Sequence, residues 1–428
     1  TTEIYTLSLH DALPIWMLCG EALADQAAEN DAVELVLDAT NFYVESGGQV
    51  SDTGCLIGPD WEMAVEAIRR PIEGVVVHIG RVVKGTPRVG DAVRAQVNSA
   101  RRWDIMRNHT ATHLLHHALR DVLGSHVAQA GSMVAPERLR FDYNHDRPIT
   151  PEQRAEIERI VTEAILANYE VSSRQEAYRD ALSQGVIALF EEKYGDVVRV
   201  LRVGNAEAPF SQELCGGTHV SRTGDIGPFM IVAESGIGAG IRRIEAMTGR
   251  GALQALQALR ARQEEAAVLL DSTPEEVTPR VQRLQEELRT AHKEIEQLNR
   301  KLARDSFQTL LSQVKEVEGI PLLVAKVTAP DAETLREMTD WFRDKVSGGV
   351  IVLGTVINDK PLLIAATTKE MTQRGVHAGN LIRQIAQIVG GGGGGRPDMA
   401  QAGGRDAAKL DEALGQVPDI VRTMLRKS

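Results

Sequence analysis

Two short motifs about a hundred residues apart must meet in space if this chain binds a metal ion, and that requirement constrains its fold more than any other feature. The first motif is H-T-A-T-H at residues 109–113, and the second is C-G-G-T-H at residues 215–219. Histidines four residues apart project from one face of a helix, so both imidazoles can reach one ion. A cysteine and a third histidine on a glycine-tight loop would complete the tetrahedral nitrogen and sulfur set that zinc prefers. The sequence therefore predicts a Zn²⁺ site with the ligands His109, His113, Cys215 and His219.

An alternative reading of the helical motif has to be weighed. His116 and His117 continue the run, and His113 with His117 repeats the four-residue spacing, so a solvated histidine face fits this segment taken alone. The C-G-G-T-H loop favours the metal site because two glycines let the backbone fold close to a ligand.

The residues also carry a family resemblance. N-F-Y-V-E-S-G-G-Q-V at 41–50, H-T-A-T-H, H-V-A-Q at 126–129 and E-L-C-G-G-T-H at 213–219 resemble the editing domain of the alanyl-tRNA synthetase family and of its free-standing, trans-editing relatives. Six glycines at 390–395, followed by R-P-D-M-A-Q-A-G-G, resemble the C-terminal domain of the same family. The resemblance covers roughly residues 17 to 428.

The resemblance implies a function and a set of site residues. It implies zinc-dependent hydrolysis of tRNA(Ala) mischarged with serine or glycine. For the substrate pocket it implies Thr110, Gln129, Gly47 and Gly48. Each has a plainer alternative: Thr110 as a residue on the helix surface, Gln129 as an outward-facing strand residue, and the two glycines as a hairpin turn. The residues implied for tRNA binding are Arg396, Arg405, Gly391, Gly392, Gly403 and Gly404.

Part of the family pattern is not found in this sequence. A class II synthetase needs an antiparallel catalytic sheet with ATP-binding arginine motifs ahead of the editing domain, and those motifs are absent, so the chain resembles the C-terminal half of the family. Residues 1–15 do not resemble the family and are similar to translated adapter sequence. They are excluded from the fold prediction.

Length and composition predict a multidomain protein of the cytoplasm. A chain of 428 residues predicts two to four domains, and a hydrophobic content of 43% is enough for ordinary cores. Neither an eighteen-residue apolar run nor a secretory leader is found, so no membrane is expected as a partner. Three cysteines at unpatterned spacings argue against a disulfide framework and suit a reducing compartment.

The net charge is unusual for an RNA-binding protein. The chain carries a formal charge of −11, whereas phosphate contacts require lysine and arginine. Residues 348–428 carry ten Lys and Arg against seven Asp and Glu, a local balance of +3. Composition therefore neither excludes nor demonstrates tRNA binding.

Patterning predicts a multidomain α+β chain of five segments. A non-family leader (1–16) precedes a small β-barrel (17–97), in which strand-length apolar runs alternate with turns. A mixed α+β segment (98–250) follows, with a helix over 98–123 that Gly124 ends, and the resemblance implies that this segment is the zinc-containing editing core. Apolar residues at alternating spacings of four and three between 277 and 302 predict a coiled-coil helical spacer (251–318). A compact α/β C-terminal domain (319–428) completes the chain, with its glycine run as a close-approach surface for phosphate.

The sequence leaves several alternatives open. One is a tRNA-binding module with structural zinc, and another is a structural protein built on the coiled coil. Homo-oligomerisation through the coiled coil or the C-terminal domain also stays open. Four protein ligands would fill a tetrahedral zinc, whereas a catalytic zinc usually keeps one position open, so the role of the metal is undecided.

Overall fold

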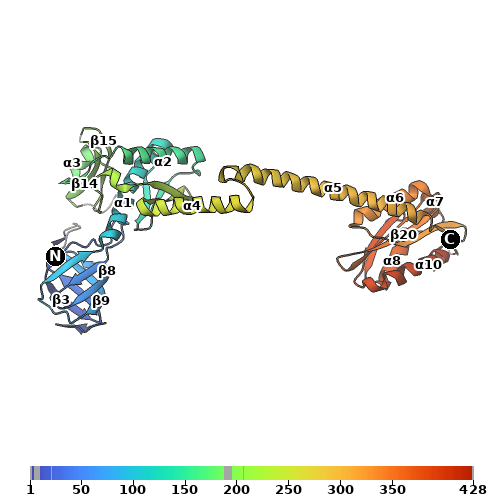
Figure 1. Ribbon diagram of the computed structural model, residues 1–428, viewed down its shortest axis with the longest axis horizontal. Coiled ribbons are helices and arrows are strands. Elements are labelled where there is room, and N and C mark those ends of the chain that lie inside the picture. Colours follow the sequence, from blue (N-terminus) through green and yellow to red (C-terminus); the bar gives the residue numbers. More distant parts are fainter. Residues whose placement is uncertain (1, 4–9, 21, 188–194, 206, 427–428) are drawn as a thin grey trace. The chain divides into compact units, whose positions relative to one another are not determined.

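The computed structural model describes residues 2–3, 10–20, 22–187, 195–205 and 207–426, which form two compact units. Unit 1 is Thr1–Glu265 and unit 2 is Ala266–Ser428, and each is described by itself. Both units mix helices with β-sheets, which confirms the predicted multidomain α+β class (Figure 1). None of the helices within these ranges is long and apolar enough to cross a membrane.

Unit 1 begins with an eight-stranded sheet that buries its own apolar core. In spatial order its strands are β2 (His10–Ala12), β10 (Val93–Val97), β7 (Gly54–Ile57), β8 (Glu62–Ile72), β9 (Val75–Lys84), β5 (Ala32–Leu37), β3 (Pro14–Cys19) and β4 (Ala22–Leu23). The strand-length apolar runs of the sequence near 33–37, 75–79 and 92–97 form β5, β9 and β10, as patterning predicts for this segment.

The predicted closure of this sheet into a β-barrel is wrong. Among the described strands, β2 and β4 are the two edges and do not pair with each other. Closure needs a continuous ladder between the first and last strands, and β4 has two residues and β2 three, which is too short.

Helix α1 (Ser99–Leu123) is the central element of the second half of unit 1. The Asn98 side chain caps it by accepting a hydrogen bond from the Arg101 amide, and Gly124 ends it with a φ of 118°. The predicted helix is thereby confirmed at both ends. Leu114, Leu115 and neighbouring side chains are fully buried against α2 (Pro151–Leu166) and a four-stranded sheet. That sheet has the order β11 (Gln129–Val134), β12 (Leu139–Asn144), β17 (Ile241–Thr248) and β16 (Phe229–Gly238).

A three-stranded antiparallel sheet completes the core of unit 1. Its order is β13 (Val171–Ala177), β14 (Val197–Gly204) and β15 (Pro209–Leu214). Sequence patterning predicted β14 but missed β15. Because β15 ends at Leu214, the C-G-G-T-H loop starts directly at the end of a paired strand.

A buried ion pair joins the N-terminal sheet to α1. The Arg102 Nε of α1 lies 2.8 Å and 2.9 Å from the two carboxylate oxygens of Asp52, and both side chains are 1% exposed. Arg102 also donates to the Asn41 carbonyl at 2.9 Å, and Asp52 accepts from the Tyr43 amide at 2.6 Å. The segment that precedes and follows the S-G-G-Q turn is therefore fixed to the start of α1.

The predicted spacer is helical. Helix α4 (Gly249–Leu269) is followed by α5 (Val277–Leu311). The large apolar side chains of the heptad stripe of α5, from Val281 to Leu302, are exposed by 37% to 64%, and Ala291 within the stripe is exposed as well. A long helix with an apolar stripe is thus confirmed, whereas its pairing in a coiled coil stays a prediction.

Unit 2 is built on a six-stranded mixed sheet. Its order is β18 (Lys315–Val317), β19 (Ile320–Lys326), β20 (Val350–Ile357), β21 (Lys360–Thr367), β23 (Met399–Gly403) and β22 (Gly392–Gly395), and only β19 and β20 run parallel. The end of α5 and α6 (Ala332–Lys345) bury one face. Helices α8 (Ala378–Ile388), α9 (Leu410–Gly415) and α10 (Val417–Arg426) bury the other.

The polyglycine run forms part of this sheet. Four of its glycines make the edge strand β22, which pairs with β23. A Cβ at Gly391 would lie 1.9 Å from the Gly403 carbonyl oxygen, and one at Gly393 would lie 2.3 Å from the Ala402 Cβ. The glycines therefore allow close packing of two backbone segments, and their predicted contact with phosphate stays a prediction.

Candidate metal centre

The four predicted ligands converge in unit 1. His109 and His113 lie one turn apart on α1, and Cys215 and His219 lie on the loop after β15. One ligand atom from each residue lies within 4.8 Å of the other three. The Cys215 Sγ is 3.4 Å from His109 Nε2 and 3.2 Å from His219 Nε2. The fold thus brings together two motifs that are about a hundred residues apart in the sequence.

The other nitrogen of each histidine is held from outside the cluster. His109 Nδ1 lies 2.6 Å from Gln49 Oε1, His219 Nδ1 lies 3.2 Å from Thr110 Oγ1, and His113 Nδ1 lies 2.5 Å from Glu213 Oε2. The oxygens of Gln49 and Glu213 can only accept, so they place the proton on Nδ1 and leave Nε2 as the free lone pair; the Thr110 hydroxyl can accept in the same way from His219. All three imidazoles are therefore arranged to present Nε2 to one point.

An orphaned atom supports the fit of a metal ion. His113 Nε2 is buried and has no hydrogen-bond partner within the described ranges. Three imidazole nitrogens and one sulfur match the donor set and the soft character that zinc prefers.

Electrostatics within the cluster favour the thiolate. Burial opposes ionisation of Cys215, but the neighbouring imidazoles of His109, His219 and His113 hold the pKa of its thiol well below the usual value. Burial also lowers the pKa of His219, to about 3. A thiolate and a neutral imidazole are the forms that bind a metal.

The S-G-G-Q turn explains how Gln49 reaches His109. Gly47 and Gly48 adopt φ values of 57° and 86°, and a Cβ at Gly48 would lie 2.5 Å from the Ser132 carbonyl oxygen of β11. The Gly48 carbonyl accepts from the Val134 amide at 2.7 Å. The two glycines therefore form a tight turn docked on β11, and the residue that they deliver to the metal centre is Gln49. Sequence reasoning quoted this motif without singling out its glutamine.

The predicted polar pocket residues take different places. Thr110 is fully buried, and its hydroxyl contacts His219 and accepts from the Val220 amide at 3.2 Å. Gln129 donates to the Ser132 hydroxyl at 3.1 Å on its own strand. Neither residue lines the cavity described next.

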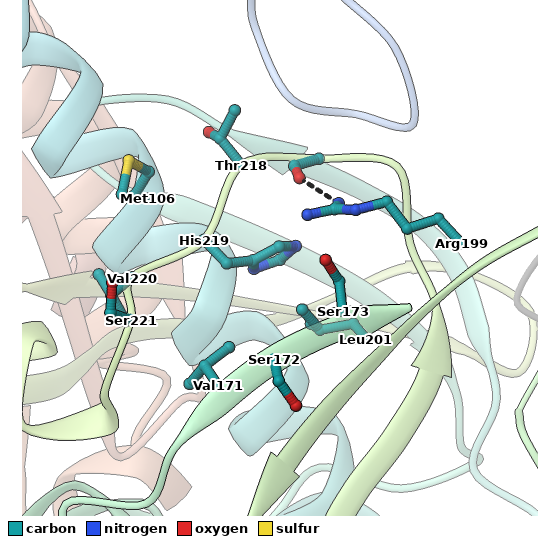
Figure 2. A pocket seen from close by; sticks show the side chains of 11 residues that line it. Met106, Val171, Ser172, Ser173, Arg199, Leu201, Thr218, His219, Val220 and Ser221 are labelled. Atoms are coloured by element: carbon teal, nitrogen blue, oxygen red, sulfur yellow. Dashed lines mark hydrogen bonds between the residues drawn. The ribbon is translucent and has the colours of Figure 1, made fainter. Parts of the chain in front are cut away.

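A cavity of about 280 Å³ lies beside the metal ligands. Figure 2 shows His219 on its wall, with Arg199 of β14 and Ser173 of β13 directed toward the same space. The Arg199 guanidinium donates to the carbonyl oxygens of Cys215 at 3.1 Å and Gly217 at 2.6 Å, and so braces the ligand loop. The cavity is lined by Met106, Val171, Ser172, Ser173, Arg199, Leu201, Gly217, Thr218, His219, Val220 and Ser221. No local motif marks Arg199 or the two serines in the sequence.

The residues predicted for tRNA binding lie in unit 2. Arg396 follows β22, is 78% exposed and lies 3.4 Å from an oxygen of Asp398. Arg405 follows β23 and is also exposed. A Cβ at Gly404 would lie 2.5 Å from Val389, whereas Gly392 and Gly403 have open space on their Cβ side. These residues therefore gather around one hairpin at the edge of the sheet.

Three family descriptions match parts of the chain. "tRNA synthetases class II (A)" matches residues 4–101, "Threonyl and Alanyl tRNA synthetase second additional domain" matches residues 198–245, and "DHHA1 domain" matches residues 319–423. The first match starts inside the leader that the sequence analysis set apart, and β2 of that leader pairs with β10.

Curated relatives match nearly the whole chain. It is 49% identical over 418 residues to an alanine–tRNA ligase of Roseiflexus sp. (strain RS-1), which covers 93% of this chain and 46% of the relative. It is 48% identical over 410 residues to the alanine–tRNA ligase of Chloroflexus aurantiacus, covering 94% of this chain and 46% of the relative. Among solved structures, the C-Ala domain from Aquifex aeolicus alanyl-tRNA synthetase is 29% identical with a TM-score of 0.24, and the match covers 25% of this chain and 96% of that one. The chain spans about half the length of the curated relatives that it matches.

Proposed function

The chain belongs to the alanyl-tRNA synthetase family, and we propose that unit 1 hydrolyses tRNA(Ala) mischarged with serine or glycine at a Zn²⁺ centre formed by His109, His113, Cys215 and His219. The observation that carries this proposal is the juxtaposition of the nitrogen and sulfur cluster with a cavity of about 280 Å³. His219 belongs to both.

The need for such an activity follows from the physics of selection. A pocket sized for alanine cannot strongly reject glycine, and a hydrophobic wall discriminates weakly against an added hydroxyl group. A second site that hydrogen-bonds the serine hydroxyl leaves its own polar groups unpaired with alanine, so the correct product is spared. Aminoacyl-tRNA synthetases that must reject small amino acids solve this problem with a second, hydrolytic site.

Residues of this chain would bind the substrate in the cavity and hold the loop that carries His219. The hydroxyls of Ser172, Ser173 and Thr218 line the cavity and offer hydrogen bonds to a polar amino-acid side chain or to ribose. Arg199 holds the ligand loop through two carbonyl oxygens, which keeps His219 in place. When bound, zinc supplies Lewis-acid polarisation of an ester carbonyl and activation of water.

Release of amino acid from three charged tRNAs tests the proposal. We expect purified chain to release serine and glycine from tRNA(Ala) but to leave alanine bound. The double variant Cys215→Ala with His109→Ala should release neither. Equal release of all three amino acids, or none by the wild-type chain loaded with zinc, would refute the editing activity.

Gln129 remains a proposed selector of the amino acid. Its side chain bonds to Ser132 on β11, the strand on which the S-G-G-Q turn docks, so Gln129 lies in the same part of the fold as Gln49. Gln129→Ala should keep zinc and a normal melting curve while changing serine-versus-alanine discrimination. Unchanged discrimination would make Gln129 part of the scaffold.

A structural zinc in a tRNA-binding module is the second candidate function. Four side chains satisfy a tetrahedral zinc completely, as in structural sites, whereas catalytic sites keep one position open. If this candidate holds, removal of zinc should unfold unit 1, and no hydrolysis should be measurable in the loaded chain. Hydrolysis that is lost on chelation, with the circular dichroism spectrum unchanged, would favour the editing site instead.

Unit 2 is proposed to bind the tRNA(Ala) body. The support is the local charge of +3 over residues 348–428 and the exposed arginines at the glycine hairpin. The exposed heptad stripe of α5 offers a surface for a second chain, so homo-oligomerisation belongs to the same proposal. A cytoplasmic location stays a prediction from the sequence.

A further inference from the structure

Glu213 is a buried carboxylate that contacts two histidines of α1. It lies on β15 two residues before Cys215, and its side chain is 2% exposed. Its Oε2 is 2.5 Å from His113 Nδ1, and its Oε1 is 3.0 Å from His116 Nδ1. The Ser211 hydroxyl donates to Oε1 at 3.2 Å. Both carboxylate oxygens are therefore occupied by groups that fix the orientation of the carboxylate.

The contact with His113 determines which nitrogen faces the metal centre. A carboxylate accepts from Nδ1–H, so the lone pair of the imidazole stays on Nε2. His113 Nε2 is the buried nitrogen that lacks a partner within the described ranges. Glu213 thus holds a metal ligand in the tautomer and ring orientation that binding requires.

His116 has no place among the ligands, although it is buried in the same helix. Its ring packs on Phe141 with centroids 5.4 Å apart, and its Nδ1 contacts the carboxylate of Glu213 rather than the cluster. Because His113 and His116 are three residues apart, the single carboxylate bridges two consecutive turns of α1 to β15.

His117 is excluded as an alternative ligand by its position. Its Nε2 lies 3.4 Å from an oxygen of Asp121, and its ring packs on Phe210 with centroids 4.1 Å apart. Of the second histidine pair in the sequence, His113 is therefore a proposed ligand, whereas His117 is a half-buried residue that contacts Asp121 and Phe210.

We propose that Glu213 is a positioning residue for the metal site, which orients His113 through its Nδ1, and that His116 acts on the same ligand by holding Glu213. The inference rests on the proposed metal centre, because positioning has meaning only if His113 binds the ion. A carboxylate that accepts a hydrogen bond from the outer nitrogen of a metal-binding histidine typically contributes about 10-fold to 100-fold in metal affinity.

Zinc affinity of the full chain tests the role of Glu213. Glu213→Gln keeps the side-chain volume but replaces one acceptor oxygen by a donor, so it cannot accept from both histidines. We expect the dissociation constant for zinc, measured by competition with a chromophoric chelator, to rise about 10-fold to 100-fold. Asp142→Asn is the matched control, because Asp142 is a buried carboxylate that pairs with Arg243 away from the ligands. That control should bind zinc with wild-type affinity.

Two substitutions at His116 keep the inference testable if Glu213→Gln fails to fold. The side-chain amide of His116→Asn places a donor near the position of Nδ1, whereas His116→Phe removes the donor. We expect wild-type zinc affinity for His116→Asn and a severalfold loss for His116→Phe, with similar melting curves of the zinc-free proteins. Wild-type zinc affinity in Glu213→Gln, or in His116→Phe where Glu213→Gln does not fold, would overturn the inference. A wild-type chain that binds no zinc would overturn the proposed metal centre itself.

Discussion

Gln49 and His109 are 60 residues apart in the sequence, yet Gln49 Oε1 lies 2.6 Å from His109 Nδ1. The same oxygen accepts from the Thr218 amide at 2.9 Å, and Gln49 Nε2 donates to the Thr218 hydroxyl at 2.9 Å. One buried amide therefore contacts both the helix and the loop that supply the metal ligands. It also links them to the N-terminal sheet.

Replacement of Gln49 by alanine should weaken zinc binding. The variant leaves His109 Nδ1 without its acceptor, so we expect a loss of about 10-fold in zinc affinity, measured by chelator competition. Gln129→Ala is the matched control, because that glutamine bonds to Ser132 and not to a ligand. Identical affinities of the two variants would show that the contact between Gln49 and His109 does not orient the ligand.

Gly217 and Gly216 should differ sharply in their tolerance of a methyl group. A Cβ at Gly217 would lie 2.0 Å from His109 Cε1, whereas one at Gly216 meets nothing within 4 Å. We expect Gly217→Ala to destabilise unit 1 by about 1–3 kcal/mol and to lose zinc affinity, because the ring must move. Gly216→Ala should behave as wild type in thermal unfolding and in metal analysis. If both variants keep wild-type zinc content and stability, the close approach of the loop to His109 is not required.

Metal analysis should find about one zinc per chain, since the four side chains form one tetrahedral set. Cys215→Ala combined with His109→Ala removes one ligand from each motif and should abolish zinc content in plasma mass spectrometry. His117→Ala serves as the control and should retain the metal, because His117 pairs with Asp121. Full retention of zinc by the double variant would contradict the ligand assignment.

The buried His78 should make the N-terminal sheet sensitive to acid. Its Nε2 lies 2.8 Å from Thr40 Oγ1. Burial lowers the pKa of His78 to about 4, although the hydrogen bond with the Leu35 carbonyl acts in the opposite direction and raises it. In the unfolded chain this histidine binds a proton below about pH 6.5, whereas in the folded chain it stays neutral until about pH 4. Its contribution to stability is therefore complete above pH 6.5 and is lost as the pH falls toward 4, on the order of 3 kcal/mol in total.

Urea unfolding at pH 7 and pH 4.5 measures this contribution. His78→Gln removes the titrating group, so the loss of stability between the two pH values should be smaller than in wild type. The same loss in both proteins would mean that other groups cause the acid sensitivity.

Salt dependence should reveal phosphate contacts at the glycine hairpin of unit 2. Removal of one phosphate contact reduces the slope of log affinity against log salt by about one. We expect this change for Arg396→Ala and for Arg405→Ala in tRNA(Ala) binding measured over a salt series. Arg422 lies on α10, where it pairs with Asp419 at 2.8 Å, and Arg422→Ala should keep the wild-type slope. If Arg396→Ala and Arg405→Ala keep the wild-type slope, as the control does, unit 2 does not contact phosphate through this hairpin. Dimerisation would then be the role proposed for unit 2.

Local signals in the sequence were sufficient to predict the four side chains that converge and the helix that carries two of them. The ends of α1 follow from a capping asparagine and a terminal glycine, and the spacing of its histidines follows from helical periodicity. Gln49 and Glu213 were not predicted as supports of the ligands, because each acts through a contact across 60 or 100 residues that no local pattern encodes.

One structural prediction failed, and one strand was missed, where strand pairing decides the outcome. Barrel closure depends on the lengths of the edge strands, and the short β4 follows a turn at Gly20 that apolar patterning does not reveal. The edge strand β22 is made entirely of glycine, a residue with poor strand propensity, and it forms because β23 lies directly after it in the chain.

The buried ion pair between Arg102 and Asp52 joins the N-terminal sheet to α1, and through this junction Gln49 reaches the proposed metal centre. Removal of one partner leaves an uncompensated buried charge, at a cost of about 3–5 kcal/mol, and releases the segment that carries Gln49. A chain cut ahead of residue 98 would retain all four ligands but lack the amide that orients His109. If the proposed centre binds zinc, its affinity should therefore depend on the contact between the N-terminal sheet and α1, because that contact places Gln49 beside His109.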